Sequence, residues 1–127
     1  MRYGLIGKTL GHSYSARLHA LLGDESYVLR SVAEEELAAF LTAQEFDGLN
    51  VTIPYKQTVI PFCAALSPTA TAVGSVNTLV KRPDGTLYGD NTDVYGFAKM
   101  VEDAGITFAG KKVLVLGSGP IIIGQAA

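Results

Sequence analysis

Residues 48–56 have the sequence Gly-Leu-Asn-Val-Thr-Ile-Pro-Tyr-Lys. The run up to Ile53 has the length and apolar content of a strand, and Pro54 ends it because proline lacks the backbone N–H that a strand uses. Asn50, Thr52 and Lys56 therefore stand near the carboxyl end of a predicted strand. Open α/β sheets tend to bind ligands at that edge, and these side chains offer donors to a polyhydroxylated acid. The alternative is an ordinary strand end whose lysine points into water.

On both sides of this stretch, predicted strands and helices alternate. Short apolar runs predict strands, and capping or turn residues mark the ends of helices. The other predicted strands are residues 3–6, 27–32, 76–80 and 86–88, the last two forming a β-hairpin around the turn at 82–85. The predicted helices begin near Ser15, Glu34, Ser67 and Asp93, with a short helix through residues 59–62. This alternation indicates a layered α/β fold.

Two helix starts carry specific expectations. Ser15 is expected to cap the helix that follows it, in which Leu18, Leu21 and Leu22 recur at helical spacing. Ser67 precedes a proline, and this pair is a strong start signal because serine accepts a backbone hydrogen bond while proline occupies a position whose N–H needs no partner.

Composition excludes several classes of protein. The 127 residues, 48% of them apolar, are enough for one domain with a real core. A formal charge of −2 with scattered Lys and Arg residues argues against nucleic acid as a partner. The single cysteine, Cys63, excludes an intrachain disulfide and a cysteine-pair metal site, so a reduced, cytoplasmic location is expected. No apolar run approaches membrane-spanning length.

The first polar cluster beside an apolar run is His12-Ser13-Tyr14-Ser15. Two hydroxyls beside the N–H groups of a helix start would suit a carboxylate. The alternative is ordinary helix capping by Ser15, with no functional role for Ser13. A metal hydrolase using His12 and His19 is a poor hypothesis, because these are the only two histidines and no acidic helix motif accompanies them.

The second cluster lies on the two sides of the hairpin. It comprises Val76-Asn77-Thr78 and Gly89-Asp90-Asn91-Thr92-Asp93. Amide and carboxylate side chains brought together in this way would bind vicinal hydroxyls, with Asp93 ionised as a base or as the partner of a cation. The alternative is turn and cap chemistry, in which Asp93 only caps the helix behind it.

Taken together, these clusters resemble the shikimate dehydrogenase family. The family's amino-terminal half carries an H-S-x-S loop, then N-V-T-x-P-x-K, a V-N-T strand and a G-x-N-T-D-x-x-G-F stretch. The chain has matching blocks in the same order at residues 12–15, 50–56, 76–78 and 89–97, and the resemblance extends from about Tyr3 to Gly119. It departs at Ala16 and Ala20, where the family usually has proline and often asparagine.

The resemblance implies a fold and an activity. The fold is a three-layer α/β/α domain with a mostly parallel sheet plus a β-hairpin, as in the amino-terminal domain of amino-acid-dehydrogenase-like proteins. The activity is the NADPH-dependent reduction of 3-dehydroshikimate to shikimate in aromatic amino-acid biosynthesis. In this family Ser13 and Ser15 would hold the substrate carboxylate, and Asn50, Thr52, Asn77 and Asp93 would contact the ring hydroxyls.

Lys56 and Asp93 are the implied catalytic residues, flanking the reacting oxygen. Negative charge grows on the carbonyl oxygen as hydride reaches the carbon, so a positioned donor must neutralise it. In the reverse direction Lys56 must lose its proton, which requires burial or a proton shared with Asp93. A close pair would titrate as one unit, so neither residue alone is assigned as the base.

Residues 1–103 are expected to form the substrate-binding catalytic domain, and residues 104–127 the start of a truncated NADP-binding Rossmann domain. Residues 113–116 predict a parallel strand covered on both faces, and Gly117-Ser118-Gly119 begins a glycine-rich cofactor turn. Pro120 removes an N–H where phosphate would bind, and Ile122 replaces the third glycine. The cofactor site is therefore expected to be incomplete.

Two further expectations follow for this polypeptide. The first expectation is an alternative to the enzyme, namely a stand-alone module that binds shikimate or quinate-like acids without redox chemistry. The second expectation is self-association, because residues 113–116 and 121–123 form an apolar surface that a second domain would normally cover.

Overall fold

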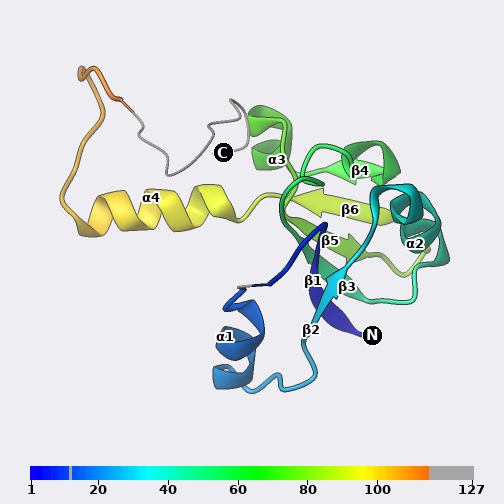
Figure 1. The fold of residues 1–127 in the computed structure, drawn as a ribbon. Coiled ribbons are helices and arrows are strands. Elements are labelled where there is room, and N and C mark those ends of the chain that lie inside the picture. The colour runs from blue at the N-terminus through cyan, green and yellow to red at the C-terminus, as the bar shows by residue number, and fades with distance from the viewer. Residues whose placement is uncertain (12, 115–127) are drawn as a thin grey trace. The chain divides into compact units, whose positions relative to one another are not determined.

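A computed structural model describes residues 1–11 and 13–114 of the chain (Figure 1). It divides into two compact units, Met1–Asn91 and Thr92–Ala127, and each is described by itself. The first contains a six-stranded sheet with its helices, and the described part of the second contains one helix.

The sheet of the first unit is mixed and mostly parallel. Its strands are β1 (Tyr3–Gly7), β2 (Val28–Ser31), β3 (Gly48–Val51), β4 (Ala65–Leu66), β5 (Thr78–Lys81) and β6 (Leu87–Asp90). They lie in the order β2-β1-β3-β5-β6-β4. Strand β1 pairs in parallel with β2 and β3, and β4 pairs in parallel with β6, whereas β5 runs antiparallel to both of its neighbours. The predicted α/β class, parallel strands and hairpin are confirmed.

Helices lie between most consecutive strands, and one helix follows β6. The α-helices are α1 (Ser15–Leu21), α2 (Leu37–Ala43), α3 (Pro68–Val73) and α4 (Asp93–Asp103), and short 3₁₀ helices lie at η1 (Glu34–Glu36) and η2 (Ile60–Phe62). None of the helices within residues 1–11 and 13–114 is long and apolar enough to span a bilayer.

The buried core lies on one face of the sheet. Leu49 and Val51 of β3 are buried there beside Ile6 of β1, packed with Leu41 of α2 and Ala70 of α3. Because side chains alternate along a strand, Asn50 must point to the opposite face. His19 of α1 lines a pocket with Asn50, so α1 lies on that opposite face. The first unit therefore has helices on both faces of its sheet.

The hairpin between β5 and β6 is closed by a turn at residues 82–85, where the sequence predicts it. Arg82 N–H donates to the Thr86 carbonyl at 2.8 Å, and Gly85 N–H donates to the Arg82 carbonyl at 2.9 Å. Gly85 has a φ of +82°, which glycine adopts without strain. The Asp84 carboxylate accepts from both the N–H and the hydroxyl of Thr86.

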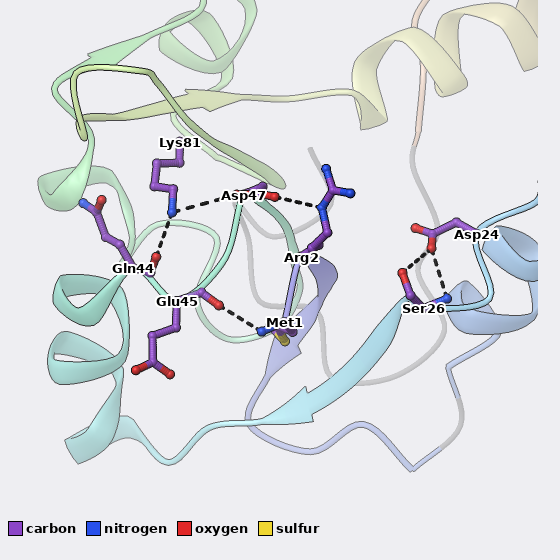
Figure 2. Close-up of polar contacts among 8 residues, drawn as sticks. All are labelled: Met1, Arg2, Asp24, Ser26, Gln44, Glu45, Asp47 and Lys81. Atoms are coloured by element: carbon purple, nitrogen blue, oxygen red, sulfur yellow. Dashed lines mark hydrogen bonds and ion pairs between the residues drawn. The ribbon is translucent and has the colours of Figure 1, made fainter.

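A group of polar contacts joins the segment after α2 to the first two residues of the chain and to β5 (Figure 2). Lys81 donates to the carbonyl of Gln44 at 3.0 Å, where the helix ends with a φ of +49°. Asp47 forms ion pairs with Arg2 at 3.0 Å and with Lys81 at 3.9 Å. The amino group of Met1 donates to the Glu45 carbonyl at 3.0 Å. These contacts fix the residues that lead into β3.

The two predicted helix starts have different outcomes. Ser67 has extended backbone and its hydroxyl oxygen accepts from Ala70 N–H at 3.0 Å, so the capping prediction is confirmed there. The prediction for Ser15 is wrong, because Ser15 is already the first residue of α1. Tyr14 stands at the cap position with helical backbone (φ −84°, ψ −4°) and makes no side-chain cap bond. A capping serine needs extended backbone, which the start of α1 does not provide.

Three further differences concern apolar segments. Leu18, Leu21 and Leu22 do lie on or beside a helix, but their exposed fractions are 58%, 77% and 84%. Strand β4 was not predicted. In the predicted strand at 113–116, Val113 and Leu114 are exposed and are not in a strand, since no neighbouring strand pairs with them in the described part of the chain. The rest of that strand, and most of the segment predicted to self-associate, lies outside the described residues.

Candidate functional site

The candidate site is built on the chain just beyond β3. Thr52 N–H donates to the Ile6 carbonyl at 2.9 Å, which continues the parallel pairing with β1 past the end of the strand. The chain then passes through a cis Ile53-Pro54 peptide bond and a turn in which Tyr55 N–H donates to the Thr52 carbonyl. Thr52 is thereby held at the carboxyl ends of β1 and β3, where the sequence predicts it.

Backbone hydrogen bonds bring Lys56 and Asn77 to the same edge. Val76 N–H donates to the Lys56 carbonyl at 2.8 Å, and Val51 N–H donates to the Asn77 carbonyl at 2.7 Å. Asn77 is buried, and Lys56 is partly buried. Two predicted site residues that are distant in sequence are thus joined through the ends of β3 and β5.

A chain of side-chain hydrogen bonds crosses this part of the sheet. The Tyr27 hydroxyl donates to Asn50 Oδ1 at 2.7 Å, and Asn50 Nδ2 donates to Thr78 Oγ1 at 3.4 Å. Thr78 Oγ1 in turn donates to Asn77 Oδ1 at 2.9 Å. The structure therefore joins the two predicted asparagines through Thr78 and adds Tyr27 at the Asn50 end, and neither residue was predicted as a site residue.

The sequence contains a signal for Thr78 but none for Tyr27. Thr78 belongs to the V-N-T block and could have been included on that ground. Tyr27 gave no local signal, because it precedes β2 and meets Asn50 only through the pairing of three strands.

A pocket of about 200 Å³ lies beside this chain of hydrogen bonds. It is lined by residues of β1, β3, β5 and α1 together with Tyr27: Tyr3, Gly4, His19, Tyr27, Gly48, Leu49, Asn50, Thr78, Leu79 and Val80. Among the predicted site residues only Asn50 contributes to this lining. The pocket is therefore an apolar space next to the polar edge rather than the predicted site as a whole.

The two predicted serines lie together. Ser13 Oγ donates to Ser15 Oγ at 3.1 Å, and it accepts from Ser15 N–H at 3.2 Å. Both side chains are partly buried. Ser13 therefore supplies the local bond that was predicted for Ser15, and both hydroxyl groups lie at the start of α1.

The strand that leads to Asp93 is fixed to Asn77. Asn77 N–H donates to the Asp90 carbonyl at 3.0 Å, and the fully buried Asn91 donates from its side chain to the Ser75 carbonyl at 3.0 Å. Asp93 itself is the first residue of α4, in the second unit. Its approach to Lys56 stays a prediction.

Burial raises the pKa of two tyrosine hydroxyls, those of Tyr27 and Tyr55. The pKa of Tyr27 is raised to about 12, first by burial and then by the negative charge of Asp24. Burial likewise raises the pKa of Tyr55, whose hydroxyl donates to the Val32 carbonyl at 2.7 Å. Both groups remain protonated donors at neutral pH. Among residues 1–11 and 13–114, no group of His, Cys, Asp and Glu could hold a metal ion. The predicted cofactor residues Gly117, Ser118 and Gly119 lie outside the described residues.

Comparison with known proteins gives related sequences and folds. Residues 5–79, more than half of the chain, match the family described as the shikimate dehydrogenase substrate binding domain. A shikimate dehydrogenase (NADP(+)) from Oleidesulfovibrio alaskensis is 47% identical over 125 residues, covering 92% of this chain and 44% of that protein. The chain thus spans about half the length of the curated relatives that it matches.

Solved structures give the same grouping. Shikimate 5-dehydrogenase from Thermus thermophilus in complex with shikimate is 33% identical with a TM-score of 0.76, covering 87% of this chain and 45% of that one. The same enzyme in complex with NADP(H) and shikimate is 33% identical with a TM-score of 0.74, covering 85% of this chain and 44% of that one. From the matched residues, the shared fold and the polar edge of the sheet, we conclude that the chain belongs to the family of shikimate dehydrogenase substrate-binding domains.

Proposed function

We propose that this chain is the substrate-binding part of an NADP-dependent shikimate dehydrogenase, which reduces 3-dehydroshikimate to shikimate. The observation that carries the proposal is the joining of Asn50, Thr78 and Asn77 by hydrogen bonds at the edge where Thr52 and Lys56 also lie. Amide, hydroxyl and ammonium groups at one sheet edge suit a carboxylated polyol. The names of the relatives support this choice of ligand and of NADP.

Different residues would bind different groups of the substrate. The Ser13 and Ser15 hydroxyls would bind the carboxylate, and Asn50, Thr52 and Asn77 would orient the ring through its hydroxyls. These contacts hold the reacting carbonyl in one geometry, which is a large part of the catalytic effect in reactions of this kind.

Lys56 and Asp93 would act at the reacting oxygen. NADPH, when bound, supplies the hydride that forms the new C–H bond. The Lys56 ammonium would donate a proton to the oxygen as its negative charge grows, and Asp93 would hold the lysine in place and share its proton. We place the substrate domain at residues 1–103 and the start of the cofactor domain at 104–127.

The first test is thermal stabilisation of the chain by shikimate, measured beside quinate. A ligand that binds only the folded state raises the melting temperature as its concentration rises. We expect Lys56→Ala to reduce this shift strongly and the matched variant Lys99→Ala to leave it unchanged. Lys99 is an exposed residue of α4 that pairs with Asp103, and it has no part in the proposed site.

NADP-dependent turnover, measured once a cofactor domain is supplied, separates a dehydrogenase from a module that only binds the acid. A wild-type chain that neither acid stabilises would refute the proposal. Equal loss of stabilisation in Lys56→Ala and Lys99→Ala would remove Lys56 from the site.

A further inference from the structure

We infer that Tyr27 is a positioning residue for the substrate site, because its hydroxyl fixes the Asn50 carboxamide with the NH₂ group directed to the ligand. This inference rests on the proposed function and adds a residue that does not itself belong to the motifs. Tyr27 and Asn50 lie 23 positions apart, and their side chains meet at 2.7 Å.

The directions of the hydrogen bonds follow from what each group can donate. Thr78 has one hydroxyl hydrogen and donates it to Asn77 Oδ1, so its oxygen must accept from Asn50. Asn50 accordingly presents Nδ2 to Thr78 and Oδ1 to Tyr27, whose hydroxyl donates. An inverted Asn50 amide would place two donors, Nδ2 and the tyrosine hydroxyl, against each other unless the hydroxyl turned to accept.

The lengths of the two contacts identify the stronger constraint on Asn50. The bond from Tyr27 is short, at 2.7 Å, whereas the bond to Thr78 is 3.4 Å and near the limit of a hydrogen bond. Tyr27 is therefore the main determinant of the amide orientation. Thr78 alone would hold it weakly.

The Tyr27 ring is itself held firmly. It is only 7% exposed, and it stacks on His19 of α1 with ring centroids 3.7 Å apart and an interplanar angle of 10°. A stacked, buried ring gives its hydroxyl one position. The raised pKa keeps this hydroxyl a donor throughout the neutral range.

The consequence concerns what the site accepts. An amide nitrogen carries two hydrogens, and Thr78 takes one of them. The second is the hydrogen that we assign to the ligand, so Asn50 should select an oxygen that accepts a hydrogen bond.

The test compares two variants that remove the same atom. Tyr27→Phe deletes the hydroxyl that contacts Asn50, and Tyr55→Phe deletes a buried hydroxyl that donates to the Val32 carbonyl instead. We expect Tyr27→Phe to weaken shikimate binding between about threefold and tenfold, the effect of one lost hydrogen bond. Tyr55→Phe should lower the melting temperature, and Tyr88→Phe, in β6 and outside the proposed site, should leave the dissociation constant unchanged. In an Asn50→Ala background, Tyr27→Phe should have no further effect on affinity, because the two residues act through one group.

A second measurement needs no ligand. The side-chain NH₂ resonances of Asn50, observed by NMR in the free chain, should shift in Tyr27→Phe and stay in place in Tyr55→Phe. Unchanged Asn50 resonances, or additive effects of Tyr27→Phe and Asn50→Ala on binding, would overturn the inference. If the wild-type chain fails to bind shikimate, the proposed function fails, and the NMR comparison still decides whether Tyr27 orients Asn50.

Discussion

Gly7 and Thr52 lie so close together at the ends of β1 and β3 that position 7 has no room for a side chain. A Cβ atom on Gly7 would come within 2.7 Å of Thr52 Cγ2 and 2.9 Å of Leu10 Cδ2. The Leu10 side chain can turn away. The backbone of Thr52 is bonded to the Ile6 carbonyl, so its methyl group has less freedom to move. The glycine therefore sets the position of a predicted ligand-binding threonine.

The variant Gly7→Ala should displace Thr52 and weaken shikimate binding about tenfold, since a shift of a few tenths of an ångström spoils a hydrogen bond. Thr52→Ser, which removes the Cγ2 methyl group and keeps the hydroxyl, should restore much of the affinity in the Gly7→Ala background. Calorimetric titration of the single and double variants measures this. Undiminished affinity in Gly7→Ala, or no recovery in the double variant, would show that the contact does not position Thr52.

Two buried serines should respond oppositely to replacement by alanine. The hydroxyl oxygen of Ser75 is buried without a hydrogen-bond partner among the described residues, and its removal should raise the free energy of unfolding by about 1 kcal/mol. Ser67 caps α3, so Ser67→Ala should lower that free energy by about 1 kcal/mol. Urea unfolding of both variants checks the pair. Destabilisation of similar size in both would mean that the Ser75 hydroxyl does find a partner in solution.

The contacts of Figure 2 should differ in strength. Lys81 is 30% exposed in its side chain and donates to the carbonyl at the end of α2, so Lys81→Met should cost about 1 kcal/mol of stability. Arg2 is 74% exposed in its ion pair with Asp47, and Arg2→Met should cost less than about 0.5 kcal/mol. Thermal unfolding at low and high salt measures both, and a larger effect for Arg2 would contradict this ranking.

Alkaline pH should weaken the fold through Tyr27. Its pKa is about 12 in the folded chain against an ordinary value of 10.0, so the folded state holds the proton more tightly than the unfolded state does. The resulting stability is complete below about pH 10 and is lost as the pH rises through about 12. Unfolding measured across this range should show a shallower decline in Tyr27→Phe than in the wild type. Tyr55 contributes with the same sign in both, and identical declines would refute the assignment to Tyr27.

Much of the fold is predictable from sequence because its signals are local. The turn at residues 82–85 and the Ser67 cap depend on neighbours within four positions, and both are confirmed. Strand β4 could not be predicted, because two residues show no periodicity and their pairing with β6 is decided by the tertiary fold. Ser15 illustrates the limit of a capping rule, since backbone angles rather than residue type exclude it.

The candidate site was likewise predictable in part. Asn50, Thr52, Lys56 and Asn77 lie in recognisable motifs, and the structure places them at one edge of the sheet. Tyr27 lies outside every motif, and only the tertiary fold brings its hydroxyl to Asn50. The helical spacing of Leu18, Leu21 and Leu22 predicts a helix but does not reveal whether anything covers these side chains.

The strand order gives the first seven residues a role greater than their position in the chain suggests. Strand β1 is flanked by β2 on one side and β3 on the other, so it is an interior strand. Shortening the chain from the amino end would not trim an edge but would detach β2 from the rest of the sheet. Variants of this protein made for crystallisation or labelling should therefore keep residues 1–7 intact.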